Sequence, residues 1–155
     1  MNSCIVTIPF YKETLTTNEQ ISFERMCYLF KENQLVILAP YKLDLSFVNQ
    51  FLENNKISIK YFANKYFSSI NGYNKLLLSP SFYKHFLNFD YLLIYQLDAF
   101  IFHNNLDEWC RKNYDYIGAP WLDTSNSFRF YQKMSKSNNL LLNWLKKKID
   151  FNKGE

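Results

Sequence analysis

Strand-like apolar runs alternate with helix-like segments along most of this 155-residue chain, and that alternation limits the fold more than any other feature. The runs typical of buried strands are 4–10, 35–39, 57–61 and 91–95. Between the first two, Phe23, Met26 and Phe30 recur at the spacing of one helix face. Thr16 and Glu19 precede them at the spacing of a capping box. Strands that alternate with helices predict an α/β domain with a mostly parallel sheet.

The composition excludes several classes of protein. The glycines are only Gly72, Gly118 and Gly154, too far apart for a G-x-G-x-x-G fingerprint or a phosphate loop. The net charge of +4 includes few arginines, so we expect no nucleic-acid partner. Three cysteines without a C-x-x-C pair predict reduced thiols in a cytoplasmic protein. The sequence contains neither a signal-peptide pattern nor an apolar run long enough for a transmembrane segment.

Ligands of parallel sheets bind beyond the carboxyl ends of the strands. The predicted strand ends with polar residues are 9–12, 40–44 and 96–100. Asp98 follows a run of apolar and aromatic residues, so we expect a carboxylate at the exit of a buried strand, where it is costly without a partner. One interpretation is a ligand for Mg²⁺ or Mn²⁺, or an acceptor for a sugar or ribose hydroxyl. The other is a cap or turn after the strand.

The second half of the chain gives further local predictions. Asn71-Gly72 predicts a turn before a short helix, whose first N–H groups and Lys75 would attract a phosphate; the alternative is a solvated turn with a surface lysine. Ser79-Pro80 predicts the start of a helix. The side chains expected on its buried side are Phe82, Tyr83, Phe86 and Leu87. The later elements expected are a central strand over 91–95, a short strand at 116–117 and a helix over 138–149.

Several segments, taken in order, resemble a known family. They are TIPFYK at 7–12, VILAP at 36–40, YFSSINGYNK at 66–75, LSPSFY at 78–83, IYQLDAF at 94–100 and YDYIGAPW at 114–121. The ordered set resembles an uncharacterised-domain family of glycosyltransferase-like proteins, over roughly residues 4–122. The resemblance implies a Rossmann-like GT-A fold, in which a sheet with flanking helices binds a nucleotide-sugar at its strand ends.

The resemblance also implies a site and its ligands. The implied donor-binding residues are Tyr11, Lys12, Asn74, Lys75, Gln96 and Asp98. Asp98 takes the acidic, D-x-D-like position and is the implied ligand of Mg²⁺ or Mn²⁺. The residues implied to shape the sugar or acceptor pocket are Gly118, Ala119, Pro120 and Trp121. The implied partners are a nucleotide-sugar, a uridine one in the first instance, and a glycan or surface-polysaccharide acceptor.

Two departures from the family pattern matter. Phe100 stands where a full D-x-D motif has its second Asp, which leaves the need for a metal open. Relatives continue into a glycine-rich acceptor segment, but here only Gly154 follows Gly118. We therefore expect a C-terminally truncated domain, with a donor-binding domain over 1–122 and a divergent helical tail over 123–155. No catalytic residue is assigned.

The expected function is sugar transfer from a nucleotide diphospho-sugar by a hexosyltransferase-type enzyme. The alternative is an inactive remnant or a non-catalytic binding module. The expected location is the cytoplasm. The C-terminal lysines 146–148, in an otherwise apolar segment, leave peripheral association with the inner face of the membrane open.

Overall fold

The computed structural model describes residues 3–52 and 56–118. The helices and strands are β1 (Cys4–Pro9), α1 (Thr17–Leu29), β2 (Gln34–Pro40), α2 (Asn49–Leu52), β3 (Ile57–Phe62), α3 (Ile70–Leu77), α4 (Pro80–Tyr83), β4 (Tyr91–Ile94) and α5 (Leu106–Arg111). Residues up to Tyr114 form one unit, and the chain from Asp115 on belongs to a second. The expected helix over 138–149 and the expected domain boundary at 122 lie outside the described residues.

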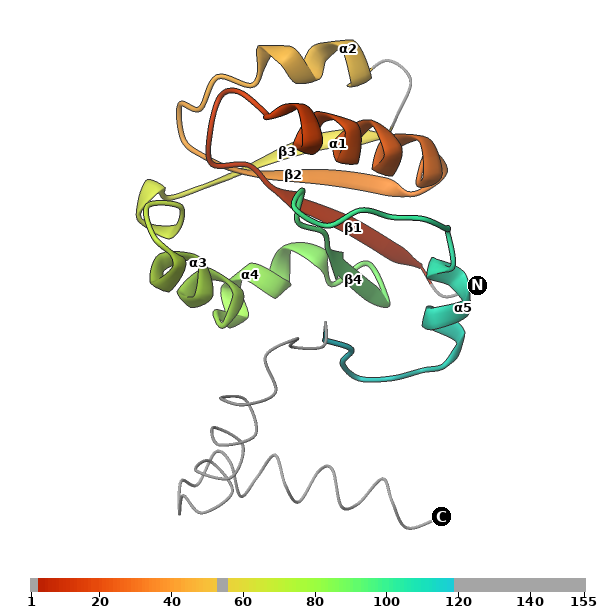
Figure 1. The fold of residues 1–155 in the computed structure, drawn as a ribbon. Coiled ribbons are helices and arrows are strands. Elements are labelled where there is room, and N and C mark those ends of the chain that lie inside the picture. The colour runs from red at the N-terminus through yellow and green to blue at the C-terminus, as the bar shows by residue number, and fades with distance from the viewer. Residues whose placement is uncertain (1–2, 53–55, 119–155) are drawn as a thin grey trace, which may run out of the picture. The chain divides into compact units, whose positions relative to one another are not determined.

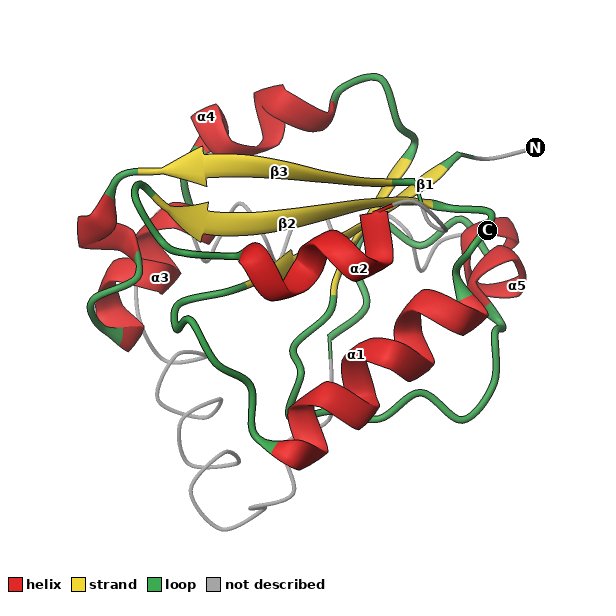
Figure 2. Cartoon of the chain, turned by 90° about the horizontal axis from the view of Figure 1, so that it is seen from above, coloured by secondary structure: helices red, strands yellow, loops and turns green. Residues whose placement is uncertain are grey.

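Within the described residues, four parallel strands form the sheet in the order β3-β2-β1-β4. Thr7 of β1 pairs with Val36 on one side and with Ile94 on the other. α1 and α2 lie on one side of the sheet, and α3 and α4 on the other (Figure 1). Figure 2 shows β2 and β3 side by side and running in the same direction. This arrangement confirms the predicted α/β domain with a parallel sheet and is compatible with a Rossmann-like fold.

The central strands are buried on both faces, which is why they read as continuous apolar runs. Val6 and Ile8 of β1 pack towards α1, where the predicted helix face of Phe23, Met26 and Phe30 is buried. On the other face, Ile5, Val36 and Leu38 pack with Leu76, Phe82 and Phe86. The alternation of neighbouring side chains between two cores fixes the register of the sheet, because a slip of one residue would exchange the two faces.

The start of α1 confirms the predicted capping box. The Thr16 hydroxyl accepts a hydrogen bond from the Glu19 N–H, and the Glu19 carboxylate accepts one from the Thr16 N–H. Asp44, in the loop after β2, accepts a hydrogen bond from the Ser46 N–H at 2.9 Å, at the start of a short 3₁₀ turn that leads into α2. No described helix, α1 included, has the length and apolar character needed to cross a membrane.

The prediction that 91–95 is the central strand is wrong. β4 pairs with β1 only, so within the described part of the chain it lies at the edge of the sheet, and its residues are half-buried. The apolar content of a strand reflects how its faces pack: Leu93 packs against one core and Leu92 against the other, although β4 has no second neighbouring strand. The short strand expected at 116–117 is also absent, since these two residues are exposed and irregular.

The prediction of a turn at Asn71-Gly72 is wrong, because both residues lie inside α3. The helix begins earlier, where the Ser69 hydroxyl accepts a hydrogen bond from the Gly72 N–H at 3.1 Å. A Cβ at Gly72 would lie only 2.3 Å from the carbonyl oxygen of Lys65. Glycine is therefore needed for a close approach of two backbone segments, and Lys75 falls in the last turn of α3, away from its N-terminus.

Ser79 and Pro80 mark the start of α4, as predicted. The predicted buried side is only half right: Phe82 and Phe86 are buried, whereas Tyr83 and Leu87 are exposed. The reason is that α4 ends at Tyr83 and the chain tightens into a 3₁₀ turn over Lys84–Phe86, so the spacing of 3.6 residues per turn no longer holds.

Candidate functional site

Two hollows lie at the carboxyl ends of the described strands. The first, called here the tyrosine hollow, has a volume of about 340 Å³. Its lining follows β1, β2 and β3 in the chain and consists of Tyr11, Glu13, Pro40, Tyr41, Lys42, Leu43, Asn64, Phe67 and Ser68. The second, called here the Asp98 hollow, has a volume of about 470 Å³. Its lining comes from the start of α1 and the loop after β4 and consists of Thr16, Asn18, Glu19, Ile21, Ser22, Leu97, Asp98, Ala99 and Phe100.

The position of the Asp98 hollow follows from the strand order. The chain builds outwards from β1 through β2 to β3 and then returns to place β4 on the other side of β1. The loops that follow β1 and β4 therefore diverge, and in parallel α/β sheets the space between such loops is where ligands bind. The Asp98 hollow lies between segments that follow these two strands.

Asp98 lies where its carboxylate is exposed to solvent. The expectation of a costly carboxylate at the exit of a buried strand is wrong, because β4 ends at Ile94, Tyr95 is the last buried residue before the Asp98 loop, and the chain then turns outwards. The folded chain thus holds this carboxylate without the cost of burying it, and the carboxylate is accessible to a ligand. Phe100, at the place of the second acidic residue, lines the same hollow and is exposed.

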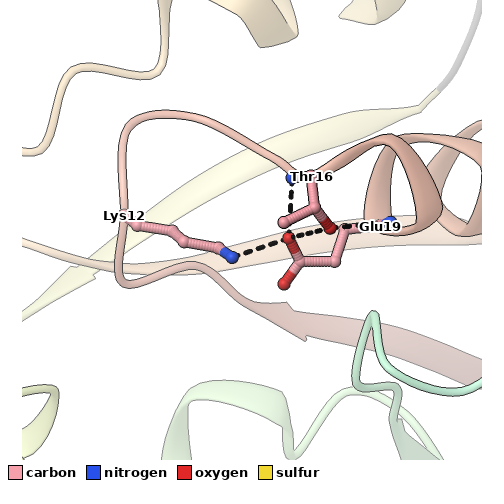
Figure 3. A network of polar contacts seen from close by, with 3 residues as sticks. All are labelled: Lys12, Thr16 and Glu19. Carbon is pink, nitrogen blue, oxygen red and sulfur yellow. Dashed lines mark hydrogen bonds and ion pairs between the residues drawn. The ribbon is translucent and has the colours of Figure 1, made fainter.

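Lys12 is engaged by a carboxylate that the sequence identified only as a helix cap. Its ammonium lies 2.6 Å from Oε2 of Glu19, and the same oxygen accepts hydrogen bonds at 2.8 Å from the Thr16 N–H and from the Thr16 hydroxyl (Figure 3). Burial acts to raise the pKa of Glu19, but the hydrogen bonds from Lys12 and Thr16 outweigh it and hold that pKa below its ordinary value. Lys12 therefore fixes the loop between β1 and α1, and its charge is already compensated.

The loop that carries Asp98 is attached to α1 by a buried polar network. The hydroxyls of Ser22 and Tyr95 lie within hydrogen-bonding distance of each other and of the carbonyl oxygen of Ala99, at 2.5 and 2.7 Å from that oxygen, and their two protons form two of these three hydrogen bonds at a time. Arg25 donates to the carbonyl oxygen of Phe102 at 2.9 Å. Burial raises the pKa of Tyr95, partly offset by its hydrogen bond with Ser22, so the hydroxyl stays neutral. No local pattern predicts this network, because its members are far apart in the chain.

The tyrosine hollow combines aromatic rings with a strained lysine. Tyr11 is 61% exposed, and the ring of Tyr41 stacks on Tyr61 with centroids 6.3 Å apart and planes 18° apart. Lys42 follows directly with a φ of 70°, a left-handed conformation that is uncommon outside glycine. Residues held in such a conformation cost free energy and cluster at ligand-binding sites. Of the implied donor residues, Tyr11 lies here.

Gln96, Asn74 and Lys75 do not line either hollow. Asn74 and Lys75 are exposed on α3, which packs on the opposite face of the sheet from α1. Gln96 is close enough to the Tyr73 hydroxyl to counteract part of the rise that burial causes in the pKa of Tyr73. That hydroxyl is nevertheless buried without a properly formed hydrogen bond to any described residue. The structure therefore brings Gln96 to α3, but does not bring Asn74 and Lys75 to Asp98.

The implied sugar or acceptor pocket falls largely beyond the described residues. Gly118 is exposed and belongs to the second unit, while Ala119, Pro120 and Trp121 lie outside the described residues. Within the described part of the chain, no group of three or more His, Cys, Asp or Glu side chains could hold a metal ion. An ion at Asp98 would therefore need other ligands than such a side-chain group, and a bound phosphate compound and water supply most of the ligands of Mg²⁺ in many proteins.

Comparison with known proteins gives one family and no named relative. No curated protein and no solved structure matches the chain. A family model described as "Protein of unknown function (DUF5672)" matches residues 56–151, from the start of β3 through the Asp98 loop and beyond α5. Because this match spans more than half of the sequence, the chain belongs to that family of proteins of unknown function.

Proposed function

We propose that the chain is the donor-binding part of a glycosyltransferase that uses a nucleotide diphospho-sugar. The observation that carries the proposal is the Asp98 hollow, which lies where the strand order reverses beside β1 and contains an exposed carboxylate. Both hollows fall within the range of about 300–1,000 Å³ that is typical of small-molecule sites. The ordered sequence motifs around Asp98 favour a nucleotide-sugar over other small ligands.

In this proposal, the two hollows divide the donor between them. The tyrosine hollow would take the uracil and ribose, since Tyr11 and Tyr41 offer exposed aromatic faces and Asn64 and Ser68 offer hydrogen-bonding groups. The Asp98 hollow would take the diphosphate and the sugar. Its polar lining of Asn18 and Asp98 suits hydroxyl groups, and Phe100 suits the apolar face of a sugar ring.

A divalent ion, Mg²⁺ or Mn²⁺, would bind between Asp98 and the diphosphate. Asp98 would supply one oxygen ligand, and the remaining ligands would come from the diphosphate and water. The chemistry that such an ion supplies is neutralisation of the leaving diphosphate. The proposal also includes a glycan acceptor, a sugar or acceptor pocket shaped by Gly118–Trp121, and a location at the inner face of the membrane.

A calorimetric titration with uridine diphosphate in the presence of Mn²⁺ tests the donor site. We expect the wild-type chain to bind and Asp98→Asn to weaken binding at least tenfold. Asp107→Asn is the matched control, because it removes the same charge from an exposed position on α5, which packs on the opposite end of β1. An absence of wild-type binding, or equal binding by Asp98→Asn, would sink the donor-site assignment.

A second titration separates the two hollows. Tyr11→Ala removes an exposed aromatic face from the tyrosine hollow, and Tyr28→Ala removes an equally exposed ring from α1, outside both hollows. We expect Tyr11→Ala to weaken uridine diphosphate binding by about 5- to 100-fold, as for the loss of a base-stacking ring. Tyr28→Ala should bind as the wild type does. Identical binding by both variants would show that the nucleobase does not bind in the tyrosine hollow.

A binding module without transferase activity is the second candidate. It is favoured by Phe100 at the second acidic position and by the lack of a three-residue metal-binding group among the described residues. The two candidates differ in turnover. Release of uridine diphosphate from several uridine diphospho-sugars, measured with and without glycan acceptors, would identify an enzyme, whereas donor binding without any release would identify the module.

A further inference from the structure

Two of the three cysteines lie against each other, although they are far apart in the sequence. Cys4 is the first residue of β1, and Cys110 lies in the last turn of α5. The side chain of Cys110 is hydrogen-bonded to that of Cys4, and α5 packs against β1. Both residues are buried, with 8% and 5% of their surfaces exposed, and neither is oxidised. The pair lies at the amino-terminal end of β1, away from both hollows.

The third cysteine has different surroundings. Cys27 lies on α1, packed in the core on one face of the sheet. Burial raises the pKa of the Cys27 thiol to about 12, and the charged group that acts on it is Glu24 rather than another cysteine. Cys27 therefore serves as an internal reference: a thiol of comparable burial without a thiol neighbour.

We propose that Cys4 and Cys110 are a modification site, at which a thiol oxidant converts the two thiols into a disulfide that ties α5 to β1. The oxidant is an electrophilic diazene or a small-molecule disulfide. With a diazene, one cysteine sulfur adds to the N=N bond, and the second sulfur then attacks the first and displaces the nitrogen compound. The S–S bond forms, both thiol protons and two electrons pass to the diazene, and the product is a hydrazine.

The surroundings of the pair make this reaction slow. Burial, together with Cys110 and Asp107 on α5, raises the pKa of the Cys4 thiol to about 12, so the reactive thiolate is scarce at neutral pH. Because both cysteines are buried between α5 and β1, a movement of α5 would expose the sulfurs to an oxidant. That helix has only six residues, and its Trp109 side chain is 47% exposed. It is therefore among the elements that open at small free-energy cost.

The bond would change how the Asp98 loop is connected. The chain from Asp98 runs through the segment fixed to α1 by Arg25 and then into α5. With α5 tied covalently to the start of β1, both ends of that stretch would be attached to the rest of the unit. The carboxyl end of α5, at Arg111, would then be held in place against β1.

The test treats the folded full chain with diamide at pH 8 and counts free thiols by alkylation and mass measurement. We expect the number of free thiols to fall from three to one, and the mass of the chain to fall by two units. Digestion should yield one linked pair of peptides, containing Cys4 and Cys110. Dithiothreitol should restore three thiols. Retention of all three thiols, or a linked peptide that contains Cys27, would overturn the proposal.

Variants distinguish the pair from general oxidation. Cys27→Ser should form the intramolecular bond at the wild-type rate, whereas Cys110→Ser should form none. If Cys110→Ser does not fold, Cys4→Ala gives the same comparison from β1, and the linked peptides of the wild type decide the question by themselves. A wild-type chain that forms its bond only in denaturant, and not when folded, would also contradict the proposal.

Discussion

The Ser22 hydroxyl on α1 donates a hydrogen bond to the carbonyl oxygen of Ala99, one residue after Asp98, at 2.5 Å. Tyr95 donates to the same carbonyl oxygen at 2.7 Å. A loop that carries an exposed carboxylate is thus fixed at its base by two buried hydroxyls. The position of Asp98 is set by α1, although β4 and not α1 leads directly into its loop.

Replacing Tyr95 by Phe should destabilise the protein through this network. The change removes the hydrogen bonds to Ala99 and Ser22 and keeps the buried ring, so we expect a loss of about 1–2 kcal/mol in the free energy of unfolding. Urea denaturation measures it. Tyr91→Phe is the control, since its hydroxyl donates to Asn113 at an exposed position, and it should change stability by less than about 0.5 kcal/mol. Equal losses in the two variants would contradict the structural role of the network.

Glu19 should make stability depend on pH in the acid range. Its pKa in the folded state lies below its ordinary value of 4.5, so its charged form is stabilised by folding. That contribution is fully present above pH 4.5 and is lost as the pH falls through the lower folded-state pKa. Glu19→Gln retains a side chain suited to the capping box but lacks the charge.

Thermal unfolding at a series of pH values measures this effect. Below pH 4.5 the wild type should lose stability more steeply than Glu19→Gln. Glu24→Gln, an exposed carboxylate on the same helix, should follow the wild-type curve. Parallel curves for the wild type and Glu19→Gln would show that the Lys12–Glu19 contact does not stabilise the fold.

Gly72→Ala should destabilise the chain although alanine is the better helix former. The new Cβ would lie 2.3 Å from the carbonyl oxygen of Lys65, so backbone must move. We expect a loss of about 1–3 kcal/mol, as for overpacking elsewhere. Asn71→Ala, at an exposed position of the same helix, should leave stability unchanged or raise it slightly. A higher unfolding temperature for Gly72→Ala would refute the close approach.

Phe82 and Leu87 should differ sharply in their effect on stability, although the sequence placed both on a buried face. Phe82 is fully buried between α4 and the sheet, whereas Leu87 is 75% exposed. We expect Phe82→Ala to lose about 3–5 kcal/mol and Leu87→Ala less than about 0.5 kcal/mol. Denaturant unfolding distinguishes them, and similar losses would mean that the chain does not tighten after Tyr83.

Local patterns predicted the first half of the fold well. The strand at Cys4–Pro9 and the helix after Thr16 follow from an apolar run, a capping box and a helical repeat, all of which act within a few residues. The prediction of a turn at Asn71-Gly72 was wrong because glycine is needed there for the close approach to the backbone of Lys65. Turn preferences depend on neighbouring residues and do not include such a contact. The prediction that Leu87 is buried was wrong because α4 ends at Tyr83 and a 3₁₀ turn follows. No sequence pattern indicates that change from 3.6 to three residues per turn.

The candidate site was harder to predict than the strands. Its position followed from the rule for parallel strand ends, and Asp98 and Tyr11 do line hollows there. The environment of Asp98 was misjudged because the strand stops at Ile94, before the apolar run does. The ion pair of Lys12 and the hydroxyls under the Asp98 loop come from residues that only the folded chain brings together.

The central place of β1 has a consequence for the order in which the protein is made. The Thr7 hydroxyl donates to the carbonyl oxygen of Leu93, a residue 86 positions later in the chain. During synthesis, β1 can pair with β2, and β2 with β3, long before β4 leaves the ribosome, so the tyrosine hollow can form first. The Asp98 hollow can form only after β4 pairs with β1. Among the described strands this pairing joins the residues farthest apart in the chain, so it carries the largest loop-closure entropy cost.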